Sequence, residues 1–389
     1  MNIRALAASA CLVLAGSQSP AATDARATLS SATATPALSP TPHSDSLKVA
    51  FIGGSITEGA FSSVPAESYA GLLTSWLRTH YKTVEARNTG LGGTGSEFGA
   101  YRTSHDMAGF APDLAFIEFA VNDAGNQRPA LFAHIDAIVY KLRQANPRVK
   151  IVYLSTTDVR EEADRRAGRR ASWVEDSAAA ASYAGLQYID VAAGIWAKVK
   201  GGTPVTHFFV DVVHPNDAGH RRYFEAIRDA MAPSIPLARQ PRATGSRLIG
   251  QSKLDSARLE KGSSAAGCRP GALSLRYMEA ALSCDRGDSF TYTFTGTTVG
   301  LVKAEVRDGG RLACTIDGGS PTTADFYSDA THIYERPFPL FLYRDLPSGR
   351  HRLACRVIDD LISLPQGTST GRKVTVGYFM VSDERPVTL

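Results

Sequence analysis

The stretch Lys48-Val-Ala-Phe-Ile-Gly-Gly-Ser-Ile-Thr-Glu-Gly59 begins as a short apolar run and stops at two glycines. A run of this length that ends in turn residues is typical of a buried β-strand. Similar runs follow at residues 84–87, 114–119, 149–154 and 186–191. Because segments with helical apolar spacing separate them, the pattern predicts βαβ units. We therefore expect an α/β domain with a mainly parallel sheet and helices on both faces.

The pattern changes from about residue 245, where turn signals such as Asp-Gly-Gly and Pro-Ser-Gly become frequent. Between the turns run short apolar segments at 289–295, 299–306, 311–316, 339–343, 350–358 and 373–381. Short strands bounded by such turns predict an antiparallel β-sandwich, or jelly roll. The expected organisation is thus an α/β domain over residues 47–235 followed by an accessory β-sandwich domain over residues 245–389.

Four of the five cysteines lie in this second region: Cys268, Cys284, Cys314 and Cys355. Alternation along the strands places Cys314 and Cys355 on the same face as the apolar residues. Two disulfides are the simplest expectation, and three pairings are possible. We favour Cys268–Cys284 and Cys314–Cys355. A zinc site is the alternative, although the paired C-x-x-C spacing typical of one is missing.

The first residues suggest an exported protein. A basic start, an apolar run that ends near Gly16, and small residues near Ala21 and Ala22 together predict a signal peptide over residues 1–22. The run is too short to span a membrane, which takes ~20 apolar residues, and no later stretch is that long. Residues 23–46, rich in Ser, Thr, Pro and Ala, are predicted to be a linker. We expect the protein to be secreted or periplasmic.

The composition limits the classes of partner. The chain has 42 basic and 38 acidic residues, a formal charge of +4, and 43% of its residues are hydrophobic. A nucleic-acid-binding protein concentrates far more positive charge, so we expect no nucleic-acid partner. The oligomeric state is not indicated by any pattern in the sequence.

Polar residues that follow the predicted strands are the candidates for chemistry, because ligands of parallel sheets bind beyond the carboxyl ends of the strands. Ser55 follows the first run at a glycine-flanked turn, where its hydroxyl would be exposed. Asn122 follows the third run and could donate its side-chain amide into the same place. Asp211 and His214, three residues apart in Asp-Val-Val-His-Pro, could pair a carboxylate with an imidazole. Such a pair is the base and orienting group of a serine triad.

The second run is followed by the glycine-rich stretch Asn88-Thr-Gly-Leu-Gly-Gly-Thr-Gly95. Glycines let the backbone approach a ligand closely and direct N–H groups at it. Three of these glycines also match the dinucleotide spacing G-x-G-x-x-G, so nucleotide binding stays open as an alternative. A metal site formed by His207, Asp211 and His214 is a second alternative, although no other block supplies the usual ligands.

Taken together, these blocks resemble the SGNH (GDSL-type) hydrolase family over residues 48 to about 232. The resemblance implies a three-layer, flavodoxin-like α/β domain. It also implies that Ser55 is the nucleophile, His214 the general base and Asp211 its orienting carboxylate. The oxyanion hole would then consist of the N–H groups of Ser55 and Gly93 and the side-chain amide of Asn122.

The chain departs from the family pattern at three places near the site. Gly54 stands where the naming motif of the family has Asp, Ile56-Thr57 follows the serine where the family has Leu, and Ala120 stands where a glycine is more usual. All three departures leave the residues that would carry out the reaction in place.

The resemblance also suggests a class of substrate. An exported enzyme of this kind with a β-sandwich domain is similar to bacterial carbohydrate esterases, which implies hydrolysis of acetyl esters on a polysaccharide or oligosaccharide without a metal or other cofactor. Exposed aromatics of the second domain could bind sugar, although core packing is expected for at least half of them; the candidates are Tyr327, Tyr334, Phe338, Phe341 and Tyr343. The alternatives are a lipid or aryl esterase of the same family and a catalytically silent carbohydrate-binding protein.

Overall fold

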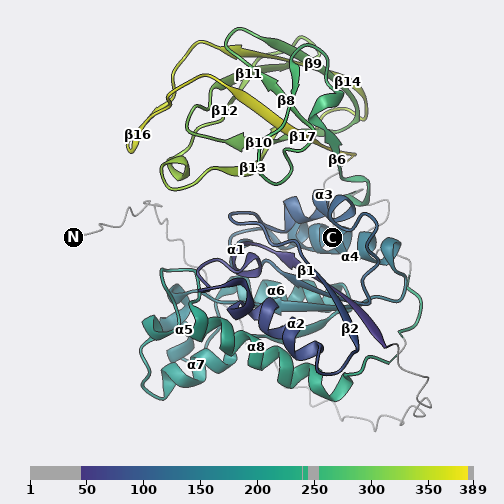
Figure 1. Ribbon diagram of the computed structural model, residues 1–389, viewed down its shortest axis with the longest axis vertical. Helices are drawn as coiled ribbons and strands as arrows, with labels where there is room; N and C mark the ends of the chain where they lie inside the picture. Colours follow the sequence, from purple (N-terminus) through teal and green to yellow (C-terminus); the bar gives the residue numbers. More distant parts are fainter. Residues whose placement is uncertain (1–44, 239, 244–253, 384–389) are drawn as a thin grey trace, which may run out of the picture. The chain divides into compact units, whose positions relative to one another are not determined.

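The computed structural model describes residues 45–238, 240–243 and 254–383 (Figure 1). The expected signal peptide at 1–22 and nearly all of the expected linker at 23–46 lie outside these residues. The described residues belong to one compact unit. No helix in the described part of the chain is long and apolar enough to cross a membrane.

The first domain is built on a five-stranded parallel sheet with the order β2-β1-β3-β4-β5. Its strands are β1 (Ser46–Gly53), β2 (Thr83–Asn88), β3 (Leu114–Glu118), β4 (Lys150–Ser155) and β5 (Gln187–Asp190). Each strand coincides with one of the apolar runs, so the expected parallel α/β sheet is confirmed. The strand order is the flavodoxin-like one, in which the direction of winding reverses between β1 and β3. The carboxyl ends of these two strands are therefore where a ligand site is expected.

Alternate side chains of the sheet enter two separate cores. Val49 and Phe51 pack on the face covered by α2 (Tyr69–Leu77), α7 (Ala193–Lys200) and α8 (Asp217–Met231). Ala50 and Ile52 pack on the other face with α3 (Ser96–Asp106), α4 (Arg128–Ala145) and α6 (Ser172–Tyr183). Figure 1 shows α3 and α4 on one side of the sheet and α2 and α8 on the other. This arrangement confirms the three layers.

The remaining helices are short. They are α1 (Ser55–Glu58), α5 (Glu162–Arg166) and the 3₁₀ helices η1 (Pro65–Glu67), η2 (Val159–Glu161), η3 (Val205–His207), η4 (Ala232–Ser234), η5 (Leu254–Ser256), η6 (Gly262–Ser264) and η7 (Asp329–His332).

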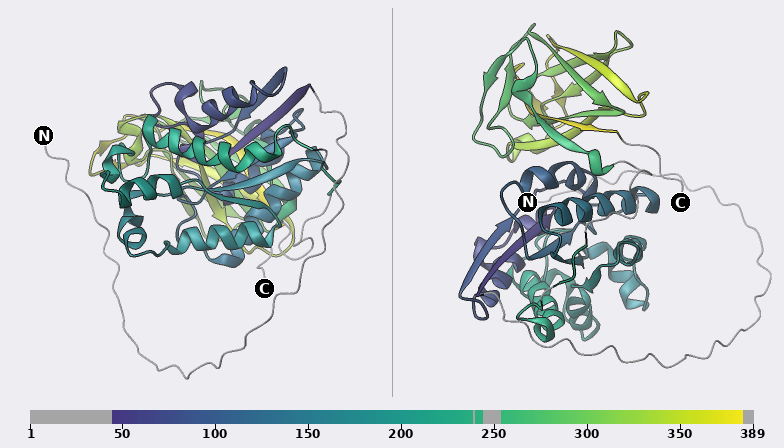
Figure 2. Two further views of the ribbon diagram at one scale, coloured as in Figure 1. Left: turned by 90° about the horizontal axis from the view of Figure 1, so that it is seen from below. Right: turned by 90° about the vertical axis from the view of Figure 1, so that its right-hand side faces the viewer.

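The second domain consists of antiparallel strands (Figure 2). One sheet has the order β13-β10-β17-β8-β7, with β6 paired to β17, and the other has the order β12-β11-β14-β9. Their inner faces share one buried core, in which Leu301 and Phe379 of the first sheet meet Leu312 and Leu353 of the second. The expected β-sandwich is therefore confirmed.

The strands of this domain are β6 (Arg258–Lys261), β7 (Arg269–Gly271), β8 (Ala281–Cys284), β9 (Ser289–Gly296), β10 (Thr298–Glu305), β11 (Arg311–Ile316), β12 (Thr322–Asp325), β13 (Arg336–Tyr343), β14 (Gly349–Ile358), β15 (Ser363–Leu364), β16 (Gly367–Thr368) and β17 (Val374–Ser382). The β13 strand begins earlier than expected, at Arg336. Pro337 and Pro339 are accommodated because β13 lies at the edge of its sheet.

Two disulfides join Cys268 to Cys284 and Cys314 to Cys355, which is the pairing favoured from the sequence. Cys314 and Cys355 are direct partners in the register between β11 and β14. A disulfide of this kind typically stabilises a domain by ~2–4 kcal/mol, largely by restricting the unfolded chain.

The core that contains α3 continues into the second domain. Tyr101 of α3 belongs to the same buried cluster as Met278 and Met380. The hydroxyl of Tyr101 lies 2.6 Å from Ser382 Oγ. Tyr277 donates a hydrogen bond of 2.7 Å to Asp106 at the end of α3. The second domain thus shares apolar and polar contacts with the helix that follows the glycine-rich stretch.

Candidate active site

Ser55, His214 and Asp211 come together at the carboxyl end of β1. Ser55 is the first residue of α1, and the other two lie in the loop before α8. Ser55 Oγ lies 2.8 Å from His214 Nε2, and His214 Nδ1 lies 2.8 Å from Asp211 Oδ2. A hydroxyl bonded to a base that is itself bonded to a carboxylate is the arrangement that activates a serine nucleophile.

The loop that carries the histidine is held by its own backbone. Asp211 Oδ1 accepts hydrogen bonds of 2.7 Å from the N–H groups of both Val213 and His214. Desolvation alone would raise the pKa of Asp211, but the hydrogen bonds from His214 and Val213 outweigh it and lower this pKa. An ionised carboxylate can only accept, so Nδ1 of His214 carries the proton. Nε2 is then free to accept the proton of Ser55.

A buried polar network holds the short helix that begins with Ser55. Thr57 Oγ1 donates to Glu118 Oε2 over 2.8 Å and lies 2.8 Å from the hydroxyl of Tyr69. Thr156 donates to the other oxygen of Glu118 over 2.7 Å. Burial raises the pKa of Glu118 in spite of these donors. Because the network ties α1 to the ends of β3 and β4, it fixes the turn on which Ser55 sits.

The glycine-rich stretch after β2 lies against the nucleophile. A Cβ placed on Gly92 would be 3.7 Å from Ser55 Cβ. The Gly92 N–H donates to Glu58 Oε2 over 2.9 Å, which ties the stretch to the end of α1. The next residue, Gly93, has φ of +71°, a backbone conformation that glycine adopts without strain. The turn that contains the Gly93 N–H is therefore held beside Ser55.

Asn122 lies in the turn after β3 and packs directly on Gly54. A Cβ placed on Gly54 would come within 2.1 Å of Asn122 Oδ1 and 2.9 Å of its Cγ. The departure from the family motif at this position thus has a steric reason, because glycine leaves room for the amide next to Ser55. The structure brings the three residues expected to form the oxyanion hole, Ser55, Gly93 and Asn122, to one place.

Residues 51–222 match the GDSL-like Lipase/Acylhydrolase family. These residues belong to that family, the SGNH hydrolases. The family consists of lipases and acylhydrolases, so the first domain is an ester hydrolase domain. No curated protein matches the sequence.

Two solved structures of a two-domain esterase (CEX) active on acetylated mannans resemble most of this chain. One matches with a TM-score of 0.70 over 88% of this chain and 92% of that chain, at 19% sequence identity. The other, co-crystallized with mannopentaose, matches with a TM-score of 0.69 over 87% of this chain and 91% of that chain, also at 19% identity. The likeness extends beyond the SGNH domain into the β-sandwich and shows a shared fold.

The nucleotide alternative does not fit the SGNH domain. The N–H of Gly92 is bound by the Glu58 carboxylate, and the N–H of Ser96 is bound by Asp123 Oδ1 over 2.9 Å. A phosphate bound here would need these two N–H groups, but each already donates to a carboxyl group. A Cβ on Gly95 would lie 2.6 Å from Asp123, so this glycine serves close packing.

The alternative metal set is not assembled either. Asp211 and His214 bond to each other, whereas the ring of His207 packs on Phe208 at 4.9 Å between centroids. Within residues 45–238, 240–243 and 254–383, no group of three or more His, Cys, Asp or Glu side chains is placed to hold a metal ion.

One serine outside the site matches the G-x-S-x-G pattern of another hydrolase class. It is Ser369, in Gly367-Thr-Ser-Thr-Gly371 of the second domain. Ser369 is buried and its hydroxyl donates to the Gly309 carbonyl over 2.7 Å. It follows the two-residue strand β16 and does not begin a helix, so it lacks the strand-to-helix turn that exposes a nucleophile.

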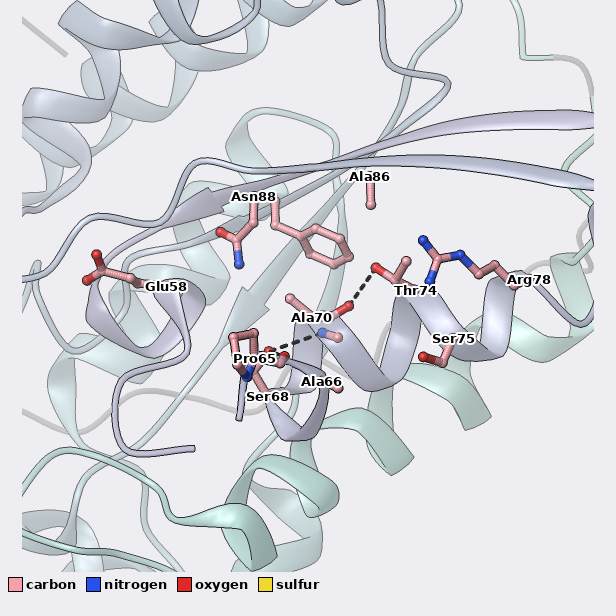
Figure 3. Close-up of a pocket in the computed structure, with 12 residues that line it drawn as sticks. Glu58, Pro65, Ala66, Ser68, Ala70, Thr74, Ser75, Arg78, Ala86 and Asn88 are labelled. Atoms are coloured by element: carbon pink, nitrogen blue, oxygen red, sulfur yellow. Dashed lines mark hydrogen bonds between the residues drawn. The ribbon is translucent and has the colours of Figure 1, made fainter. Parts of the chain in front are cut away.

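A separate hollow lies beside the site, between α2 and β2 (Figure 3). Its lining includes Glu58 and Asn88 at one end but none of the triad residues. Two of its polar groups are engaged within α2, since Thr74 Oγ1 donates to the Ala70 carbonyl over 2.7 Å and Ser68 Oγ accepts from the Gly71 N–H over 3.1 Å. We assign no function to this hollow.

Several residues at the site were not identified from the sequence. Glu58 lies one helical turn after Ser55, and this spacing was a signal that could have identified it. Two arginines of the second domain also approach the glycine-rich stretch. Arg276 donates to the Gly90 carbonyl over 2.7 Å, and Arg336 Nη1 would lie 3.3 Å from a Cβ on Gly93. No local pattern distinguishes these arginines from others in the sequence.

Replacement of Asn122 with Ala tests the oxyanion hole. We expect kcat for ester hydrolysis to fall about 10²–10³-fold while KM changes little, because the amide would act on charge that develops only in the transition state. The measurement is steady-state kinetics on a chromogenic acetate ester. Asn126→Ala, in the residues after the same turn, is the matched control and should keep wild-type kcat. A change confined to KM would contradict the role of Asn122.

Proposed function

We propose that the protein is a serine esterase that removes acetyl groups from a polysaccharide or oligosaccharide. The observation that carries the esterase mechanism is the continuous hydrogen-bonded chain from Asp211 through His214 to Ser55. The carbohydrate substrate is supported by the shared fold with a two-domain esterase active on acetylated mannans.

In the first half of the reaction, Ser55 Oγ attacks the carbonyl carbon of the acetyl ester while His214 Nε2 takes its proton. The carbonyl electron pair moves onto oxygen, and the oxyanion accepts hydrogen bonds from Ser55 N–H, Gly93 N–H and the Asn122 amide. When the tetrahedral intermediate collapses, the bond to the alcohol oxygen breaks and His214 returns the proton to that oxygen. The products are a free sugar hydroxyl and an acetylated Ser55.

In the second half, water replaces the alcohol. His214 Nε2 takes one proton of the water as the hydroxyl attacks the acetyl carbon, and the collapse returns that proton to Ser55 Oγ. Acetic acid leaves and the enzyme is restored. Throughout both halves Asp211 holds the imidazole in the required tautomer and stabilises its protonated form.

The five aromatic candidates of the second domain differ in exposure, and Phe338, Phe341 and Tyr343 are half-buried. Tyr327 is buried, and its hydroxyl lies 2.7 Å from His332 Nε2. Phe341 packs on Tyr101 at 5.3 Å between ring centroids. Tyr334 has 50% of its surface exposed. Its hydroxyl accepts from Arg336 over 3.4 Å, whereas Phe338 lies closer to the site, with Cε2 3.6 Å from a Cβ placed on Gly93. Phe338, which is half-buried, and the exposed Tyr334 are therefore the aromatics of this group placed to meet a sugar chain near Gly93.

The alternative of a lipid or aryl esterase has one supporting observation. Phe61 and two valines that flank Asp211, Val210 and Val212, leave about half of their surfaces exposed close to the triad. Such side chains suit an apolar or flat group on the substrate. The alternative of a silent carbohydrate-binding protein is disfavoured because the triad is assembled with hydrogen-bond geometry.

Acetate release from a panel of substrates tests the proposed function. The panel contains acetylated mannan, xylan and pectin, and p-nitrophenyl esters of short and long fatty acids. We expect acetate release from at least one polysaccharide and, among the p-nitrophenyl esters, a preference for acetate. Preference for long acyl chains without release from any polysaccharide would instead support a lipid esterase. Inactivity on every ester would support the silent binding protein.

We also propose that the protein is secreted or periplasmic. The two disulfides of the second domain support this, because disulfides persist mainly in oxidising compartments. In a bacterial expression host, the full chain should leave the cytoplasm, whereas a variant lacking residues 1–22 should remain there. Equal cytoplasmic retention of both chains would contradict the proposal.

A further inference from the structure

Phe61 combines two features that do not favour folding. Its φ is +63°, in the left-handed region that bulky side chains rarely adopt. In addition, 54% of its surface is exposed, although the side chain is large and apolar. Strained backbone that persists in a folded protein tends to occur at functional sites, where the surrounding structure enforces it.

Hydrogen bonds at both ends of the segment enforce this conformation. Before Phe61, the Ala60 N–H donates to the Ser55 carbonyl over 3.0 Å, at the end of α1. After it, the Ser63 N–H donates to Asp217 Oδ1 over 2.8 Å, at the start of α8. Phe61 is therefore held between the helix that begins with the nucleophile and the helix that follows the histidine.

The ring of Phe61 lies on the catalytic histidine. The two ring centroids are 5.1 Å apart and the rings are tilted by 40°. A side chain that served only to support His214 would gain most by being buried with it. The exposed fraction of Phe61 instead leaves much of its surface accessible to a molecule that binds beside His214.

The mechanism identifies which part of the substrate reaches this surface. The alcohol oxygen of the ester must come within hydrogen-bond distance of His214 Nε2 to receive its proton. The carbonyl oxygen must instead point to Gly93 and Asn122. The group attached to the alcohol oxygen therefore lies on the His214 side of the site, where Phe61 is.

We propose that the exposed surface of Phe61 is a subsite for the leaving group, on which the pyranose ring that carries the acetyl ester packs through its C–H groups. This inference rests on the proposed function and adds a residue that selects the alcohol part of the substrate. It assigns no role to Phe61 in the choice of the acyl group.

Kinetics with two acetate esters test the subsite. One substrate is the acetylated oligosaccharide best used by the wild type, and the other is ethyl acetate, whose leaving group is too small to cover the ring. We compare kcat/KM for the oligosaccharide with kcat/KM for ethyl acetate. Phe61→Ala should lower the ratio of these two values about tenfold, mainly by raising KM for the oligosaccharide. A tenfold change corresponds to the loss of one aromatic contact. Phe61→Tyr, which keeps an aromatic ring, should keep this ratio close to the wild-type value. The matched control is Val64→Ala, a change of an exposed apolar residue three positions later, which should leave the ratio at its wild-type value.

A second variant separates binding from folding. Asn tolerates the left-handed conformation far better than Phe. Phe61→Asn should therefore keep or raise the Tm. It should also lower the ratio of the two kcat/KM values to the same extent as Phe61→Ala. A loss of Tm in step with the loss of oligosaccharide activity would show that Phe61 is structural and would overturn the proposal.

Other outcomes would also overturn it. An equal fall of kcat for both esters with an altered pH profile would mean that Phe61 only positions His214. A changed ratio of acetate to butyrate hydrolysis would place Phe61 on the acyl side. If the wild type and Phe61→Ala deacetylate the oligosaccharide equally well, the proposed subsite is wrong but the proposed function stands. If the wild type hydrolyses ethyl acetate but no acetylated saccharide, the proposed function fails together with the subsite.

Discussion

Replacing Ser55 with Ala is expected to lower kcat for acetyl ester hydrolysis roughly 10⁵–10⁶-fold. Without Oγ no acyl-enzyme can form, and His214 has no proton to accept. The remaining rate would come from binding and from the oxyanion donors acting on a direct attack by water. We expect no other replacement near the site to have a larger effect on turnover.

The same substitution should leave the fold intact. The hydroxyl of Ser55 bonds to His214 Nε2, and neither side chain belongs to the two apolar cores of the SGNH domain. Circular dichroism and thermal unfolding of Ser55→Ala should therefore match those of the wild type. Ser62→Ala, a change in the segment after α1, is the control and should keep full activity. Retained turnover in purified Ser55→Ala would mean that Ser55 is not the nucleophile.

Replacing Asp211 with Asn is expected to lower kcat about 10⁴-fold. The amide oxygen can still accept the N–H groups of Val213 and His214, so the loop should keep its shape. The amide nitrogen, however, would then face Nδ1 of His214 and donate to it. The imidazole would have to carry its proton on Nε2, and it could no longer accept the proton of Ser55.

Steady-state kinetics over a range of pH distinguish this tautomer effect from a general loss of charge. The wild-type carboxylate has a lowered pKa and stays ionised well into the acid range, so its own titration should not limit activity near neutral pH. Asp229→Asn, on an exposed part of α8, is the charge-matched control and should be nearly silent. A loss of less than tenfold in Asp211→Asn would show that the carboxylate does not set the tautomer.

The SGNH domain and the residues of the proposed triad could be identified from the sequence because their signals are local. Each of the five parallel strands is one apolar run, and alternation along β1 divides Val49 and Phe51 from Ala50 and Ile52. The rule that ligands bind beyond the carboxyl ends of strands then identified Ser55, although no distance to His214 can be read from the sequence.

Other features depend on contacts between distant segments, and for these the sequence holds no periodic signal. The strand β7, Arg-Pro-Gly, has no apolar pattern and exists because it pairs with β8. Arg276 reaches Gly90 only because the second domain packs near the glycine-rich stretch. The left-handed backbone of Phe61 results from hydrogen bonds to both α1 and α8, so its position on His214 was not predictable either.

The central claim is that Ser55 performs the hydrolysis of acetylated saccharides, and covalent labelling tests it most directly. The enzyme is treated with an organophosphorus ester that reacts with activated serines, and acetate release from an acetylated oligosaccharide is measured alongside peptide mapping by mass spectrometry. We predict one label per chain, on Ser55, a loss of acetate release in proportion to labelling, and protection by the oligosaccharide. Full acetate release from enzyme labelled completely at Ser55 would contradict the account.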